Sequence, residues 1–199
     1  KELERVAPLL CAGITTYSPL KYAGVGKGHK VAVLGLGGLG HMGVKFAVSM
    51  GAEVTMLSTS PSKENDAKML GAHHFALSTD KDQMKALRGQ FDFILNTVAA
   101  KYDLNKFLDL LTVEGKMLLV GIPPEDNELG SAKLISRRRS IIGSNVGGIA
   151  ETQEMLDYCA EHNILSDVEM IQMKDINEAY TRISNSDVKY RFVIDMASM

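Results

Sequence analysis

The sequence has no tryptophan, only two cysteines, and no excess of charge of either sign. The 22 Lys and Arg residues balance 24 Asp and Glu residues, so we expect neither a nucleic acid nor a membrane as the main partner. Two cysteines, Cys11 and Cys159, cannot build a disulfide framework and are typical of a reducing cytosol, which predicts a cytoplasmic protein. The absence of tryptophan excludes nothing.

Long hydrophobic runs are also missing. The longest apolar stretch, residues 31–42, is interrupted by glycines and by His41, and it is too short to span a bilayer. With 45% hydrophobic and 23% charged residues, the 199-residue chain is typical of a globular protein. It starts at Lys1, not Met, and without a signal peptide, so we expect a piece of something longer.

Apolar runs bounded by glycine or turn residues predict strands, and amphipathic stretches between them predict helices. The expected strands are 30–35, 53–57, 73–77, 91–96, 116–120 and 140–144. The expected helices are 2–10, 12–22, 41–50, 61–70 and 101–111. Strands that are apolar on both faces and alternate with helices indicate an α/β fold, a doubly wound parallel sheet covered on both sides.

The alternation is lost after Gly147-Gly148, which places a domain boundary near Ile149. The expected elements beyond it are a helix over 151–161, a strand over 168–173, a helix over 176–183 and a strand over 192–194.

A glycine-rich segment, Gly35-Leu36-Gly37-Gly38-Leu39-Gly40, matches the pattern G-x-G-x-x-G. The motif is weak alone, but here it follows a predicted strand and opens a predicted helix, as dinucleotide binding requires. The first glycine permits the turn, the second admits a pyrophosphate and the third lets helix and strand pack closely. The alternative is a glycine-rich turn without a ligand. We expect Gly35, Gly37, Gly38, Leu39 and Gly40 to hold the pyrophosphate.

The end of the second strand carries hydroxyls and a cation where NAD-binding proteins have a carboxylate. The residues there are Ser58, Thr59, Ser60 and Lys63, and no acid occurs before Glu64. Hydroxyl donors and a lysine can bind a 2′-phosphate, so this segment favours NADP over NAD. The same hydroxyls could also cap the following helix.

Further motifs lie on both sides of these two segments. They are APLLCAGITTY at 7–17, GSNVGG at 143–148 with ETQEML at 151–156, and KYRFV at 189–193. Together with the glycine loop and the segment 58–63, they occur in the order found in one family. The chain resembles the zinc-dependent medium-chain alcohol dehydrogenases, in the branch of the cinnamyl alcohol dehydrogenases and NADP-dependent aldehyde reductases.

The resemblance implies roles for further residues. Cys11 corresponds to a ligand of the catalytic zinc, although a lone Cys is more often a buried apolar residue. Thr15 corresponds to a contact near the nicotinamide. The lining of the cofactor's ribose and carboxamide corresponds to three strand ends, which are Thr97-Val98, Val120-Gly121 and Ser144-Asn145-Val146.

The family's N-terminal catalytic domain has no counterpart in this sequence, and with it go the other zinc ligands and the proton relay. The resemblance therefore implies three parts: a remnant of the catalytic domain at 1–10, a dinucleotide-binding Rossmann domain at 11–149, and a segment at 150–199 that returns to the catalytic domain. We expect no catalytic residue in this chain, because one cysteine cannot hold a catalytic zinc.

The expected function is the NADP(H)-binding part of an enzyme that passes hydride between NADPH and an aldehyde or alcohol, aided by zinc. A non-catalytic nucleotide-binding module and a zinc-independent quinone reductase are the alternatives. A homodimer is also expected, paired through the strand at 140–144, since unpaired sheet edges are liabilities. The alternative is that Ile141 and Ile142 are core residues covered by the helix over 151–161, with the three arginines protecting the edge.

Other polar residues have simpler interpretations. His73 and His74 point to opposite faces of a strand. His41 follows the last glycine of the loop and could approach a phosphate, but it is expected to face solvent from its helix. Arg137-Arg138-Arg139 is expected to complement the dipole of a helix over 132–139. Cys159 shares a helix face with Met155 and is expected in the core.

Overall fold

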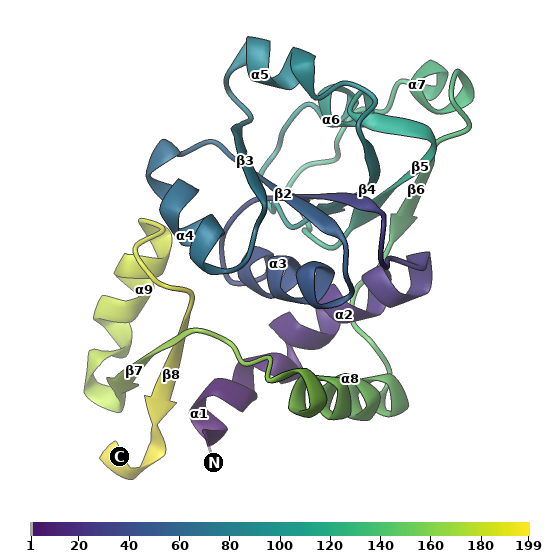
Figure 1. The fold of residues 1–199 in the computed structure, drawn as a ribbon. Helices are drawn as coiled ribbons and strands as arrows, with labels where there is room; N and C mark the ends of the chain where they lie inside the picture. Colours follow the sequence, from purple (N-terminus) through teal and green to yellow (C-terminus); the bar gives the residue numbers. More distant parts are fainter. Residues whose placement is uncertain (1) are drawn as a thin grey trace.

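The computed structural model describes residues 2–199, so Lys1 of the expected remnant 1–10 lies outside the described residues (Figure 1). Six parallel strands form the main sheet in the order β3-β2-β1-β4-β5-β6. Their bounds are β1 Lys30–Leu34, β2 Glu53–Ser58, β3 His74–Leu77, β4 Phe91–Asn96, β5 Leu111–Leu119 and β6 Ser140–Gly143. This strand order is that of the doubly wound Rossmann sheet, so the predicted fold class is confirmed.

The helices cover both faces of this sheet. Their bounds are α1 Leu3–Val6, α2 Ala12–Ala23, α3 Gly40–Ser49, α4 Glu64–Met69, α5 Lys81–Ala86, α6 Leu104–Leu108, α7 Ser131–Ile135, α8 Ile149–His162 and α9 Ile176–Ser184, with a 3-10 turn at Ala7–Leu10. Among the described residues no helix is both long and apolar enough to cross a membrane.

Strand β1 shows how alternating side chains build two cores. Val31 and Val33 join the cluster that packs against α2 and α3, whereas Ala32 and Leu34 join the cluster that packs against α6. Because successive strand residues point to opposite faces, a fully apolar strand is buried on both sides. Cys159 of α8 lies in the first cluster, which confirms its prediction as a core residue.

The end of the chain forms a second, two-stranded sheet. Its strands β7 (Val168–Gln172) and β8 (Arg191–Asp195) are parallel, and α9 connects them. Figure 1 shows this unit beside α1, below the edge of the main sheet. Two interactions hold the segment just before β7 against α3. Lys45 Nζ donates to Leu165 O at 2.7 Å and pairs with Asp167 at 2.9 Å.

One predicted helix is shorter in the structure, and one helix of the structure was not predicted. Helix α6 is shorter than the predicted 101–111, because β5 already begins at Leu111 and pairs there with Phe91. Helix α5 was not predicted; the Asp80 side chain caps it by accepting from the backbone of Asp82 and Gln83. Lys81, Asp82 and Lys85 leave this short helix with too little apolar periodicity to be recognised.

The prediction that the three arginines complement a helix dipole is wrong. Helix α7 ends at Ile135, so the arginines do not lie in its last turn. Arg139 is buried and its guanidinium donates to the backbone oxygen of Leu111 at 2.6 Å. The side chain thus binds the backbone of the first residue of β5 and does not complement a helix dipole.

Candidate functional site

The glycine loop connects the end of β1 to the first turn of α3, at the carboxyl edge of the sheet. Gly35 has φ of +93°, a conformation that side-chain-bearing residues rarely adopt. A Cβ on Gly40 would lie 1.8 Å from the backbone oxygen of Gly35, so helix and loop can approach only without a side chain. A Cβ on Gly37 would meet nothing within 4 Å. The loop is therefore tight at its ends and open at Gly37.

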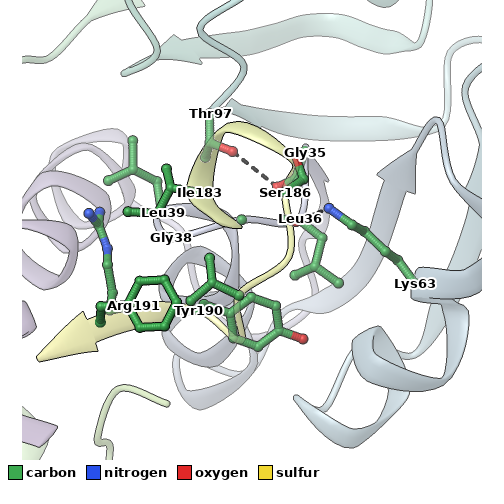
Figure 2. A pocket seen from close by; sticks show the side chains of 13 residues that line it. Gly35, Leu36, Gly38, Leu39, Lys63, Thr97, Ile183, Ser186, Tyr190 and Arg191 are labelled. Carbon is green, nitrogen blue, oxygen red and sulfur yellow. Dashed lines mark hydrogen bonds between the residues drawn. The ribbon is translucent and has the colours of Figure 1, made fainter. Parts of the chain in front are cut away.

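Thr97, which follows β4, holds the start of the loop. Its Oγ1 donates to Leu34 O at 2.9 Å and to Gly35 O at 3.0 Å. Figure 2 shows the bond to Gly35 at the edge of a pocket. This pocket has a volume of about 500 Å³ and is lined by Gly35, Leu36, Gly37, Gly38, Leu39, Lys63, Thr97, Ile183, Ser186, Val188, Tyr190, Arg191 and Phe192.

Lys63 stands on one side of the pocket, beyond β2. Its Nζ donates to Leu36 O at 2.7 Å, and burial lowers its pKa, partly offset by Asp66. Ser60 and Ser62 bond to each other at 2.8 Å, and Ser58 accepts from the Ser60 backbone. None of these serine hydroxyls bonds to a helix N–H in the described part of the chain, so capping does not account for them.

Arg191 stands on the other side, at the first position of β8 (Figure 2). Its Nε is buried and has no hydrogen-bond partner among the described residues. A Cβ on Gly38 would lie 2.5 Å from this Nε, so the guanidinium rests against the middle of the loop. Buried donors are normally paired, so an orphaned guanidinium donor over a glycine loop fits an anionic ligand.

His41 was expected to face solvent, and this prediction is wrong. The residue is 0% exposed, and its ring stacks on Tyr190 with centroids 4.9 Å apart and an interplanar angle of 18°. Burial, with Lys45 nearby, lowers the pKa of His41 to about 4, so the ring is neutral at neutral pH. The sequence alone could not predict this burial, because the side chain that stacks on His41 belongs to Tyr190, far along the chain.

The other predicted cofactor residues lie outside the pocket lining. Thr15 is 7% exposed on α2, and Val120 is 6% exposed just past β5. A Cβ on Gly121 would meet the Val98 backbone at 2.2 Å, so these two strand ends touch. Beyond β6 the chain is open; Val146 is 54% exposed. The residues in this group are Thr15, Gly40, Ser58, Thr59, Ser60, Val98, Val120, Gly121, Ser144, Asn145 and Val146.

Cys11 is exposed at the start of α2. It lines a shallow depression of about 360 Å³ together with Pro8 and with Arg191 and Phe192, which both also line the main pocket. Within residues 2–199, no three His, Cys, Asp or Glu side chains gather closely enough to hold a metal ion. The described residues therefore do not form a three-ligand zinc site.

Sequence reasoning did not assign the C-terminal contribution to this pocket. Its members are Ile183, Ser186, Val188, Tyr190, Arg191 and Phe192. The available signal was Arg191 itself, a cation that opens the apolar strand Phe192-Val193-Ile194. Only the fold reveals that this strand starts beside the glycine loop.

Comparison with known proteins agrees with this geometry. The aldehyde reductase YahK of Escherichia coli is 55% identical over 196 residues, 98% of this chain but 56% of the relative. The NADP-dependent alcohol dehydrogenase C of Mycobacterium tuberculosis is 51% identical over 197 residues, 99% of this chain and 57% of the relative. The chain thus spans little more than half the length of these relatives.

Solved structures give the same picture. A cinnamyl alcohol dehydrogenase from Sorghum bicolor superposes with a TM-score of 0.96 at 45% identity, covering 98% of this chain and 56% of that one. The enzyme of this type from Helicobacter pylori, complexed with NADP(H), gives 0.89 at 47% identity, covering 97% and 55%. The model of the zinc-binding dehydrogenases matches residues 38–161. The chain belongs to the zinc-binding dehydrogenase family.

Proposed function

We propose that this chain is the NADP(H)-binding part of a zinc-dependent alcohol dehydrogenase or aldehyde reductase. The observation that carries the proposal is the pocket between the glycine loop, Lys63 and Arg191. Two cations from distant parts of the chain converge there on a glycine-rich loop, and Arg191 has a buried donor with no partner among the described residues. Relatives named for NADP dependence and a related structure in complex with NADP(H) support the choice of cofactor.

In this proposal, the residues of the pocket and those around it bind different parts of the dinucleotide. The backbone N–H groups of Gly38, Leu39 and Gly40 and the guanidinium of Arg191 hold the pyrophosphate. Lys63, with the hydroxyls of residues 58–60, holds the 2′-phosphate. The ribose and carboxamide of the nicotinamide half lie along Thr97-Val98, Val120-Gly121 and Ser144-Asn145-Val146, with Thr15 near the ring.

NADPH, when bound, supplies the hydride for an aldehyde, or NADP accepts one from an alcohol. The protein's part is to fix the dinucleotide's orientation and to keep its phosphates paired. In a longer protein, Cys11 provides one zinc ligand, and the remaining ligands come from outside the described residues. The three-part division at 1–10, 11–149 and 150–199 belongs to the same proposal.

Calorimetric titration of the chain with NADPH tests the cofactor site. We expect Arg191→Ala to weaken binding about 10- to 100-fold, because a hydrogen bond to a charged group is worth about 1.5–3 kcal/mol. The matched control is Arg138→Ala, which removes an exposed arginine paired with Glu114 and should leave affinity unchanged. A wild-type chain that binds neither NADPH nor NADH would rule the proposal out.

Turnover and metal content separate the alternatives. We expect the purified chain to show no steady NADPH oxidation with an aromatic aldehyde, since the described residues form no metal site. In a longer protein containing this segment, Cys11→Ser should abolish zinc binding. Retained zinc would contradict the role of Cys11, activity without any zinc would favour the quinone reductase, and cofactor binding without turnover in the longer protein would favour the non-catalytic module.

The dimer is proposed on the position of β6. It is the last strand of the main sheet, and in the described part of the chain its outer edge has no strand partner. Ile141 and Ile142 are half-buried there, so a twofold pairing of this edge would cover apolar surface. Sedimentation over a concentration series tests this, and a monomer at high micromolar concentration contradicts it.

A further inference from the structure

His41, the second residue of α3, makes two contacts with the same backbone oxygen of the glycine loop. Its backbone N–H donates to Gly37 O at 3.0 Å, as the helix requires. Its ring Nδ1 lies 3.2 Å from the same oxygen. A carbonyl oxygen can only accept, so Nδ1 carries the proton and Gly37 O receives two bonds from one residue.

These two hydrogen bonds to Gly37 O fix the orientation of the peptide between Gly37 and Gly38. In a planar trans peptide the C=O and N–H point in opposite directions. With Gly37 O held toward α3, the N–H of Gly38 must face away from the helix. Gly37 and Gly38 both line the pocket, which agrees with this N–H facing it.

The ring is itself held from the C-terminal segment. Tyr190 is 8% exposed, stacks on the His41 ring, and directly precedes Arg191. Its backbone N–H donates to Asp167 O at 3.0 Å, next to the pair between Asp167 and Lys45. The imidazole therefore lies between the loop and the segment that carries the orphaned guanidinium.

The state of the ring agrees with this placement. Burial lowers the pKa of His41 to about 4, so a neutral ring with its proton on Nδ1 persists under neutral conditions. In this tautomer Nε2 is an acceptor, and it is buried without a partner among the described residues. Core packing alone does not require a histidine here, since an apolar ring would fill the space without burying an unpaired nitrogen.

We propose that His41 is a positioning residue for the pyrophosphate of the dinucleotide: its side chain holds the Gly37–Gly38 peptide with its N–H toward the phosphate. The inference rests on the proposed function. It adds a determinant of cofactor affinity that lies behind the loop and does not itself touch the ligand.

Three substitutions separate the hydrogen bond from the ring. His41→Phe keeps an aromatic ring for Tyr190 and removes the donor. His41→Asn keeps a donor, since its amide nitrogen is as many bonds from Cα as Nδ1 is, and removes the ring. His41→Gln places the same amide one carbon farther out, where it no longer matches Nδ1, and serves as its matched control.

Affinities for NADPH and for adenosine 2′-monophosphate are measured on each variant of the 199-residue chain. The second probe carries the 2′-phosphate but no pyrophosphate, so the ratio of the two affinities cancels any loss of folded protein. We expect the NADPH affinity to fall about tenfold in His41→Phe and His41→Gln, with that for the 2′-monophosphate unchanged. His41→Asn should keep an NADPH affinity within about threefold of wild type, because it retains the side-chain donor. A tenfold change in affinity corresponds to about 1.4 kcal/mol.

The outcomes are distinguishable. Ratios equal to wild type in the Phe and Gln variants overturn the role of His41 while leaving the cofactor site intact. Equal losses in the Asn and Gln variants also overturn it, since the donor would then not matter. If His41→Phe does not fold, the Asn and Gln pair decides the question alone. A wild-type chain that binds no NADPH contradicts the proposed function itself and not the positioning step.

Discussion

The two ends of the candidate cofactor site are built differently. At the phosphate end, the loop 35–40, Lys63 and Arg191 enclose a pocket of about 500 Å³, and His41 is buried beneath it. At the opposite end, the segment beyond β6 is open, with Val146 54% exposed and Cys11 on the surface. Residues from three parts of the sequence enclose the first end, whereas the segment after β6 at the second end is exposed.

This difference indicates where the chain is self-sufficient. Rigid binding groups need a supporting layer, and the phosphate end has one in Thr97, His41 and the Lys45–Asp167 pair. Among the described residues, the segment after β6 has no such layer, since Asn145 and Val146 are exposed. We therefore expect the chain alone to recognise phosphates well and the nicotinamide half poorly.

The largest expected effect comes from Gly40→Ala at the phosphate end. Its Cβ would overlap the backbone oxygen of Gly35, 1.8 Å away, and a backbone atom cannot rotate aside. We expect the free energy of unfolding to fall by about 3 kcal/mol or more, the upper range for overpacking, and NADPH binding to be lost. Urea denaturation measures the first and calorimetry the second.

Gly37→Ala is the control for this substitution. Its Cβ meets nothing within 4 Å, so the stability should change by less than about 1 kcal/mol. Equal stabilities for the Gly40 variant and wild type would show that the loop is not tightly packed, and the contrast between the two ends would disappear.

A second expected effect is the acid sensitivity of the phosphate end. His41 has a pKa of about 4 in the folded chain against 6.5 as its usual value, so the unfolded state binds more protons between these values. Stability is therefore lost as pH falls through this window, by about 2 kcal/mol between neutral pH and pH 5 for this one group. The charged neighbours Lys45 and Arg191 lower the pKa of the ring further and Asp167 raises it.

Urea denaturation across this pH range measures the effect, and His41→Asn should flatten the slope because the residue no longer titrates. Other groups of the chain titrate as well, so the quantity to compare is the difference between the two proteins. An identical slope in both would mean that the histidine is accessible to protons in the folded state.

Features set by adjacent residues could be predicted from the sequence, whereas features set by contacts between distant residues could not. The strand, glycine loop and helix order is local, and so is the run from Ser58 to Lys63; these could be read from adjacent residues. The burial of His41 and the position of Arg191 depend on Tyr190 and β8, about 150 residues away along the chain. Pairing between such distant segments leaves no periodicity in a single sequence, so neither was predicted.

A third expected effect concerns cofactor choice. Lys63→Ala should lower the affinity for NADPH about tenfold and leave that for NADH unchanged, since only the former has a 2′-phosphate. The control is Lys68→Ala on α4, which removes an exposed lysine paired with Glu64 outside the pocket. Titration with both dinucleotides measures the preference, and a preference unaffected by the substitution would assign the 2′-phosphate to other residues.

The smallest expected effect lies at the open end. Asn145 follows β6, is exposed, and belongs to the segment proposed to line the ribose and carboxamide. Exposed polar contacts are exchanged with water at little net gain, so Asn145→Ala should change the NADPH affinity of this chain less than about twofold, or about 0.4 kcal/mol. Calorimetric titration of the Asn145→Ala and Lys63→Ala variants with NADPH in the same buffer gives the two affinities to compare. A tenfold loss in the Asn145 variant would mean that the open end also holds the cofactor, and that the enclosed phosphate pocket is not the main source of affinity.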